Sequence, residues 1–111
     1  MSESLYHPTT AAMAQRRKEL APHTHEAFEA FGKAVFGDGA LPKQTKQLIA
    51  VAVAHTTQCP YCIQGHTKLA RRAGATPEQI MEAIWVAAEM RAGAAYAHAT
   101  LALEALEEGS E

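Results

Sequence analysis

The chain holds only two cysteines, Cys59 and Cys62, and His66 follows four residues after the second. A Cys-x-x-Cys pair can close a small disulfide ring, and one of its thiols usually ionises more readily than a free cysteine. If the segment is helical, Cys62 and His66 lie one turn apart on one face. The imidazole can then take or return the proton that thiol chemistry requires. The spacing therefore predicts a thiol-based redox enzyme.

The two cysteines are expected at the start of a helix, because Cys59-Pro60 is typical of an N-cap followed by a first-turn proline. The partial positive charge at a helix N-terminus stabilises a thiolate, so we expect a lowered thiol pKa there. Cys62 has the better claim to be the nucleophile, because His66 lies one turn beyond it. Cys59 would then attack the oxidised Cys62 and form the disulfide.

Two other interpretations of the cysteines stay open. The pair can be two reduced, buried cysteines whose spacing is coincidental. Alternatively, His55, Cys59, Cys62 and His66 supply the four ligands of a Cys₂His₂ zinc site. All four fall within a short stretch that the helix break would have to fold inward, so we favour redox chemistry over zinc binding. That chemistry requires no metal and no organic cofactor.

Length and composition favour one small helical domain that self-associates. The 111 residues suffice for a modest core, and much of the apolar content is alanine, which favours helix but buries little area. Such a chain often covers its remaining apolar surface with further copies of itself. The formal charge of -2 and the lack of a basic stripe argue against nucleic acid as a partner.

The chain shows no targeting or membrane segment. Residues 1–6 lack a charged stretch followed by an apolar one, so they do not form a secretory signal. No apolar run approaches the roughly 20 residues of a membrane span. We therefore expect a cytosolic protein without membrane contact. In a reducing cytosol, Cys-x-x-Cys is more often catalytic or metal-binding than structural.

Proline and glycine divide the chain into short helices with no strand or hairpin pattern, which predicts an all-α fold of about five or six helices. Residues 9–20 and 22–36 are expected to form an N-terminal helical hairpin within residues 1–40, ended by Gly37-Asp38-Gly39. It packs on a motif-bearing core, residues 41–108, so that residues 1–111 form a single domain.

Within this core, one helix is expected from Pro42 to about Thr57, mostly buried through residues 48–53. A second should run from Pro60 to about Ala73, with Gly74 as its stop. Thr76-Pro77-Glu78-Gln79 is a strong start for the next helix. Its apolar stripe includes Met81 and Trp85, which we expect in the core, and Gly93 should end or bend it. A last helix leads into an acidic tail.

From Leu41 onward the chain resembles the AhpD-like alkylhydroperoxidase family, within the carboxymuconolactone decarboxylase superfamily. The resemblance covers about two-thirds of the chain and is more specific than Cys-x-x-Cys alone. The segments that carry it are Leu41-Pro42-Lys43, the apolar run 48–53 with Ala54-His55, Gln58-Cys59-Pro60-Tyr61-Cys62, His66, Ala73-Gly74-Ala75-Thr76 and residues 83–91.

The resemblance implies an AhpD-like helical fold, with a helical hairpin around the cysteine pair, assembled as a homo-trimer or homo-hexamer. It implies reduction of hydroperoxides, with Cys62 attacking the peroxide, Cys59 resolving and His66 relaying the proton. The disulfide would be re-reduced by an external dithiol, a lipoylated protein in the family's characterised system.

Two positions depart from the family pattern. Gln47 stands 12 residues before Cys59, where the family places a glutamate of the proton relay, and Tyr61 replaces a histidine of some members. An amide can form a hydrogen bond but cannot accept a proton in that role. We therefore expect slower turnover or another base. His55 is our candidate for that base, because Gln47, Val51 and His55 lie along one i+4 row.

The sequence thus predicts a thiol-dependent peroxidase. Alternatives are a disulfide reductase or decarboxylase-like enzyme of the same superfamily, a non-enzymatic redox sensor or zinc-binding module, and a structural protein that retains the cysteines. Decarboxylating relatives typically lack the cysteine pair, which argues against that activity.

Overall fold

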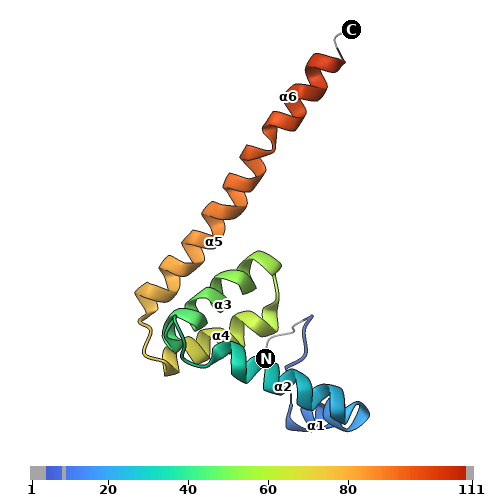
Figure 1. Cartoon of the computed structure of the whole chain (residues 1–111), viewed down its shortest axis with the longest axis vertical. Helices are drawn as coiled ribbons and strands as arrows, with labels where there is room; N and C mark the ends of the chain where they lie inside the picture. Colours follow the sequence, from blue (N-terminus) through green and yellow to red (C-terminus); the bar gives the residue numbers. More distant parts are fainter. Residues whose placement is uncertain (1–4, 9, 110–111) are drawn as a thin grey trace.

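The computed structural model describes residues 5–8 and 10–109, and these residues form six helices and no strand. The prediction of an all-α fold is therefore confirmed (Figure 1). The helices are α1 (Ala11–Leu20), α2 (Pro22–Phe36), α3 (Lys43–Thr57), α4 (Pro60–Arg72), α5 (Pro77–Ala97) and α6 (Ala99–Glu108). Among the described residues, no helix is long and apolar enough to cross a membrane.

Helix α3 is the centre of the fold, because it packs against both α4 and α5. The core between them consists of Val51, Ala70, Ala75 and Ile80, with Leu48 and Ile84 packed against it. Two of the four buried residues are alanines, so α4 and the start of α5 approach α3 closely but bury little area. The N-terminal helices α1 and α2 contact each other, and α2 contacts α3.

The helix ends follow local rules, and the boundaries predicted at these turns are confirmed. Gln58 ends α3 in the left-handed conformation (φ 57°), and Cys59 caps α4 with Pro60 as the next residue. Gly74, at φ 94°, allows the turn after α4. Thr76 and Gln79 form a complete capping box at the start of α5. At α3, Pro42 is the N-cap, one residue before the predicted first helical position.

Two expectations about α5 are wrong. Helix α5 continues through Gly93 to Ala97 and breaks only at His98. A single glycine costs a helix about 1 kcal/mol relative to alanine, which the surrounding alanines tolerate. Trp85 and Met81, expected in the core, are 65% and 47% exposed. The buried face of α5 is formed by Ile80 and Ala87, and Trp85 lies on another face.

Part of α3 is also less buried than predicted. Ile49 and Val53 are about half exposed (47% and 51%), whereas Val51 is fully buried. Helix α3 has one face toward α4 and α5, and its opposite side is open beside the end of α2. This open side forms a wall of the pocket at Cys62.

The chain is far more extended than its length requires. Its radius of gyration is 19.2 Å and it measures 61 × 37 × 33 Å, whereas a compact domain of this length has a radius of gyration of about 13 Å. The extension comes from α5 and α6, which leave the core as one rod (Figure 1). Helix α6 contacts only α5.

Replacing Thr76 by alanine removes the hydrogen bond from the Gln79 backbone N–H to the Thr76 hydroxyl, one of the two bonds of the capping box, and should destabilise the fold by about 1 kcal/mol. Urea unfolding followed by circular dichroism measures the change. Thr24→Ala, at an exposed position in the first turn of α2, removes a threonine without a side-chain cap and should leave the midpoint nearly unchanged. Equal midpoints for the two variants would contradict the role of the capping box.

Candidate active site

The two cysteines lie at the N-terminus of α4, as predicted from their spacing. Cys59 is the N-cap, and its Sγ accepts a hydrogen bond from the backbone N–H of Cys62 at 3.3 Å. The left-handed Gln58 turns the chain sharply out of α3, and Pro60 starts α4 immediately afterwards. Both cysteines are free thiols and partly buried. The thiols are thus held together by helix capping, before any disulfide forms.

The surroundings at the start of α4 shift the pKa values of the two thiols in opposite directions. The side chain and backbone N–H of Cys62 donate hydrogen bonds to Cys59, and these lower the pKa of Cys59 below its usual value. Donation to Cys59 raises the pKa of Cys62, and burial and the nearby Cys59 charge raise it further. The expected low-pKa thiol is therefore present, but in the reduced protein it is Cys59. The pair holds its first negative charge on Cys59 and its remaining proton on Cys62.

His66 is fixed by a hydrogen bond that joins α4 to α3. Its Nδ1 lies 2.8 Å from Oε1 of Gln47, which is only 6% exposed. An amide oxygen can only accept, so Nδ1 carries the proton and Nε2 is the basic nitrogen. Gln47 therefore occupies the predicted position beside the histidine and sets its tautomer. It cannot take the proton away.

The end of α2 closes the other side of His66. The ring of Phe36 stacks on the imidazole with a centroid distance of 5.1 Å. Lys46 holds this helix end in place, because its Nζ donates to the carbonyl oxygens of Val35 (2.8 Å) and Gly37 (2.6 Å). A cation at these C-terminal carbonyls also complements the helix dipole.

Cys62 and His66 line one pocket of about 380 Å³. It lies between the end of α2, the open side of α3 and the start of α4. Apart from Cys62 and His66, its lining is Val35, Phe36, Lys46, Ile49, Ala50, Val53, Ala54 and Thr57. Most of these side chains are apolar, so the pocket suits an uncharged organic molecule rather than an ion.

His55 does not join this pocket. Its Nδ1 bonds the carbonyl oxygen of Val51 at 2.7 Å, and its side chain lines a separate pocket between α3 and α5, with Arg91 and Gln58. Residues at i+4 spacing shift gradually around a helix, so two such steps from Gln47 place His55 toward α5 rather than beside Cys62. Among the described residues, no three His, Cys, Asp or Glu side chains converge as metal ligands. The four candidate zinc ligands are therefore not assembled here.

Phe36 and Lys46 were not singled out from the sequence. Their place at the site depends on how α2 ends against α3, and no local motif encodes that packing. The one available clue was the Gly37-Asp38-Gly39 break, which stops α2 directly after Phe36.

The fold and the site together define a small helical protein with a Cys-x-x-Cys pair at a helix start and a histidine one turn later. Residues 22–105 match the carboxymuconolactone decarboxylase family, and the chain belongs to that family. It is an AhpD-like member, as the resemblance predicted.

Relatives match most of the chain. The chain is 64% identical over 101 residues, 91% of each protein, to "Uncharacterized protein 4 in cox locus" of Paracoccus denitrificans. It is 39% identical over 67 residues to the alkyl hydroperoxide reductase AhpD of Mycobacteroides abscessus, a match that covers 60% of this chain and 38% of AhpD.

Solved structures share the fold. A protein from Methanobacterium thermoautotrophicum superposes with a TM-score of 0.75 at 37% identity, over 81% of this chain and 98% of that one. A carboxymuconolactone decarboxylase family protein from Legionella pneumophila gives a TM-score of 0.67 at 40% identity, over 90% and 88% of the two chains.

The order of the two pKa values predicts which thiol reacts first with an alkylating agent. Because the thiolate is the nucleophile and the pKa of Cys59 is lowered, brief iodoacetamide treatment near neutral pH should label Cys59 before Cys62. As the pH rises through the raised pKa of Cys62, labelling of the two should converge. Peptide mapping by mass spectrometry measures both, and preferential labelling of Cys62 at neutral pH would contradict the assignment.

Proposed function

We propose that this protein is a thiol-dependent peroxidase that reduces organic hydroperoxides through a Cys59–Cys62 disulfide. The observation that carries the proposal is that Cys62 and His66 line the same apolar pocket, while Cys59 contacts Cys62 at the start of α4. A nucleophile, a base and a resolving thiol are thereby available around one cavity. Membership of an AhpD-like family supports the same chemistry.

The first step is attack of the Cys62 sulfur on the distal oxygen of the hydroperoxide. The O–O bond breaks, the sulfur is oxidised to a sulfenic acid, and the other fragment leaves as an alcohol after taking a proton. Cys62 must lose its proton to attack, and Nε2 of His66 is the basic atom in its pocket. The same nitrogen can return the proton to the leaving alkoxide.

The second step closes the disulfide. The Cys59 thiolate attacks the sulfur of the Cys62 sulfenic acid, an S–S bond forms, and the hydroxyl leaves as water after protonation. An external dithiol then reduces the disulfide by exchange and is itself oxidised. A lipoyl-type dithiol on a partner protein is the class of donor that we propose.

The pocket favours organic over hydrogen peroxide as substrate. A cavity of about 380 Å³ with mostly apolar walls can bury the alkyl part of a hydroperoxide. Hydrogen peroxide has no apolar part and gains nothing from these walls.

Disulfide exchange is the second candidate function, and the ionisation of Cys59 favours it. A low-pKa thiol at a helix N-cap, next to a second thiol with a raised pKa, is the arrangement of a disulfide reductase. In that role Cys59 attacks the substrate disulfide and Cys62 resolves the mixed disulfide. The order of the two cysteines is therefore reversed relative to the peroxidase.

We further propose a reducing compartment, the cytosol, because the cycle needs thiols that return to the reduced state. We also propose that the working protein is a homo-oligomer, trimer or hexamer, since so much apolar surface remains exposed in the single chain.

The two functions are separated by single cysteine variants. With cumene hydroperoxide, Cys62→Ser should abolish peroxide consumption, whereas Cys59→Ser should consume about one equivalent and stop at a trappable sulfenic acid. With a disulfide substrate and a dithiol donor, the reductase predicts that Cys59→Ser is inactive and Cys62→Ser traps a mixed disulfide. If neither assay turns over in the wild-type protein, both functions are excluded.

Replacing His66 by glutamine should slow the oxidation of Cys62 by organic hydroperoxide about 10²-fold, the lower range for loss of a general acid–base group. His55→Gln is the matched control, because it removes a histidine from the separate pocket against α5. Stopped-flow thiol loss measures both rates. Equal slowing by the two substitutions would contradict the assignment of His66.

Introducing a carboxylate at Gln47 should accelerate the same reaction. In Gln47→Glu the new charge lies beside Nδ1 of His66 and stabilises the protonated imidazole, which the amide cannot do. We expect a gain of about tenfold in the rate of Cys62 oxidation, equivalent to ~1.4 kcal/mol. Gln64→Glu, on the exposed side of α4, adds the same charge away from His66 and should not change the rate. A rate of Gln47→Glu no faster than wild type would contradict the idea.

A further inference from the structure

A second pocket lies behind the hydrogen bond between Gln47 and His66. It has a volume of about 330 Å³ and is formed by the end of α2, the start of α3 and the end of α4, with the lining Phe36, Lys43, Gln47, Leu69, Arg72 and Ala73. Gln47 lines this pocket, whereas His66 lines the pocket at Cys62. The bond between the two side chains therefore connects one pocket to the other.

The amide of Gln47 has a hydrogen-bond donor to spare on the side of this second pocket. Its Oε1 is engaged with Nδ1 of His66 at 2.8 Å, so Nε2 is the amide atom that is left. Within residues 5–8 and 10–109, Nε2 has no hydrogen-bond partner, although the side chain is only 6% exposed. Leaving a buried N–H without an acceptor is costly, so the pocket favours a ligand that accepts a hydrogen bond there.

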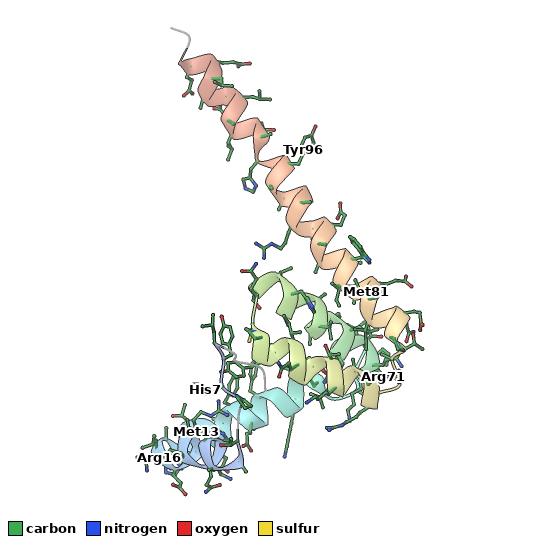
Figure 2. All side chains as sticks on the ribbon, turned by 180° about the vertical axis from the view of Figure 1, so that it is seen from behind. His7, Met13, Arg16, Arg71, Met81 and Tyr96 are labelled. Carbon is green, nitrogen blue, oxygen red and sulfur yellow. The ribbon has the colours of Figure 1, made fainter. Side chains whose placement is uncertain are left out.

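Two cationic side chains, Lys43 and Arg72, line the same pocket. In the part of the chain that the structure describes, neither side chain forms an ion pair or a hydrogen bond. Their neighbours are already engaged. The carboxylate of Asp38 accepts from the backbone N–H of Lys43 at 2.8 Å. Arg71, at the same end of α4 (Figure 2), donates to the carbonyl oxygen of Ala75 at 2.9 Å. The pocket therefore combines two unpaired positive charges with a buried donor.

We propose that this pocket binds a small organic carboxylate. The carboxylate accepts hydrogen bonds from Nε2 of Gln47 and from the guanidinium of Arg72, whose planar fork matches its geometry, and Lys43 adds a further positive charge. The alkyl part of the ligand covers the apolar side chains of Phe36 and Leu69, which inorganic phosphate cannot do. The ligand is a separate molecule from the one that enters the pocket at Cys62.

The bound carboxylate acts on His66 through the amide of Gln47. The amide donates from Nε2 to the anion and accepts at Oε1 from the imidazole, and hydrogen bonds in such a chain polarise one another. The added negative charge stabilises the protonated imidazole, as a carboxylate in place of the amide would. The use of this effect to control a proton relay rests on the proposed peroxidase function, but the site and its test do not.

The test is a titration of the ¹⁵N-labelled protein with sodium butyrate at constant ionic strength, followed by NMR. The side-chain NH₂ signals of Gln47, assigned by their loss in Gln47→Met, should shift and saturate with a Kd on the order of 1 mM. The ring signals of His66 should shift with the same midpoint. 1-Butanol lacks the charge and inorganic phosphate lacks the alkyl part, so each should bind about tenfold more weakly or not at all.

Lys43→Gln and Arg72→Gln should each weaken butyrate binding about tenfold, because each removes one charge-assisted contact. Both side chains are exposed, so the fold should tolerate the changes. Lys68→Gln, at an exposed position of α4 outside the pocket, is the matched control and should bind like wild type.

Four results would each overturn the proposal. These are Gln47 signals that do not saturate, butanol or phosphate binding as tightly as butyrate, an equal loss of affinity in Lys68→Gln, and His66 signals that stay fixed while those of Gln47 move. No arm measures peroxide consumption, so failure of the proposed peroxidase function would leave these results unaffected.

Discussion

The hydrogen bond between His66 and Gln47 is the contact on which the site depends. It crosses from α4 to α3 at 2.8 Å, and its acceptor is a buried amide. Because the amide oxygen only accepts, the bond decides which imidazole nitrogen is basic as well as where the ring lies. Phe36 stacks on the ring from α2. Three helices are thus brought to one side chain, and the pocket at Cys62 is the space that remains between them.

The rest of the fold reflects how little the core buries. Alanines allow α4 to lie close to α3, which the Gln47–His66 bond requires, but they contribute little apolar area. The chain leaves Trp85 on α5 and the leucines of α6 exposed. Because the core buries little apolar area, Ile49 and Val53 also remain exposed, and these residues form an apolar wall of the pocket. Close helix packing at the site and a large exposed surface elsewhere therefore have one cause.

The sequence correctly predicted the features that depend on a few neighbouring residues. Helix ends at Thr76, Gly74 and Cys59 follow from capping rules that act over a few residues, and Cys62 and His66 are linked by a single helical turn. Gln47 was found only through the family resemblance, since it lies 19 positions before His66 and no local pattern joins them. The positions of Trp85 and His55 depend on which side of a helix faces its neighbour. Periodicity alone does not specify that when both sides are apolar.

The different pKa values of the two thiols affect the two steps of the proposed cycle differently. In the reduced pair the first charge rests on Cys59, which does not line the pocket, while Cys62, which does, keeps its proton. In the proposed cycle, attack on peroxide therefore starts from the thiol with the raised pKa, and Gln47 adds no charge that would help His66 to take its proton. After the sulfenic acid forms in the proposed cycle, the backbone N–H of Cys62 still donates to Cys59, which favours the Cys59 thiolate that resolves it. In that cycle, disulfide formation protects Cys62 from further oxidation to the irreversible sulfinic acid. The proposed arrangement disfavours ionisation of the sulfur that attacks the peroxide and favours ionisation of the sulfur that resolves its sulfenic acid.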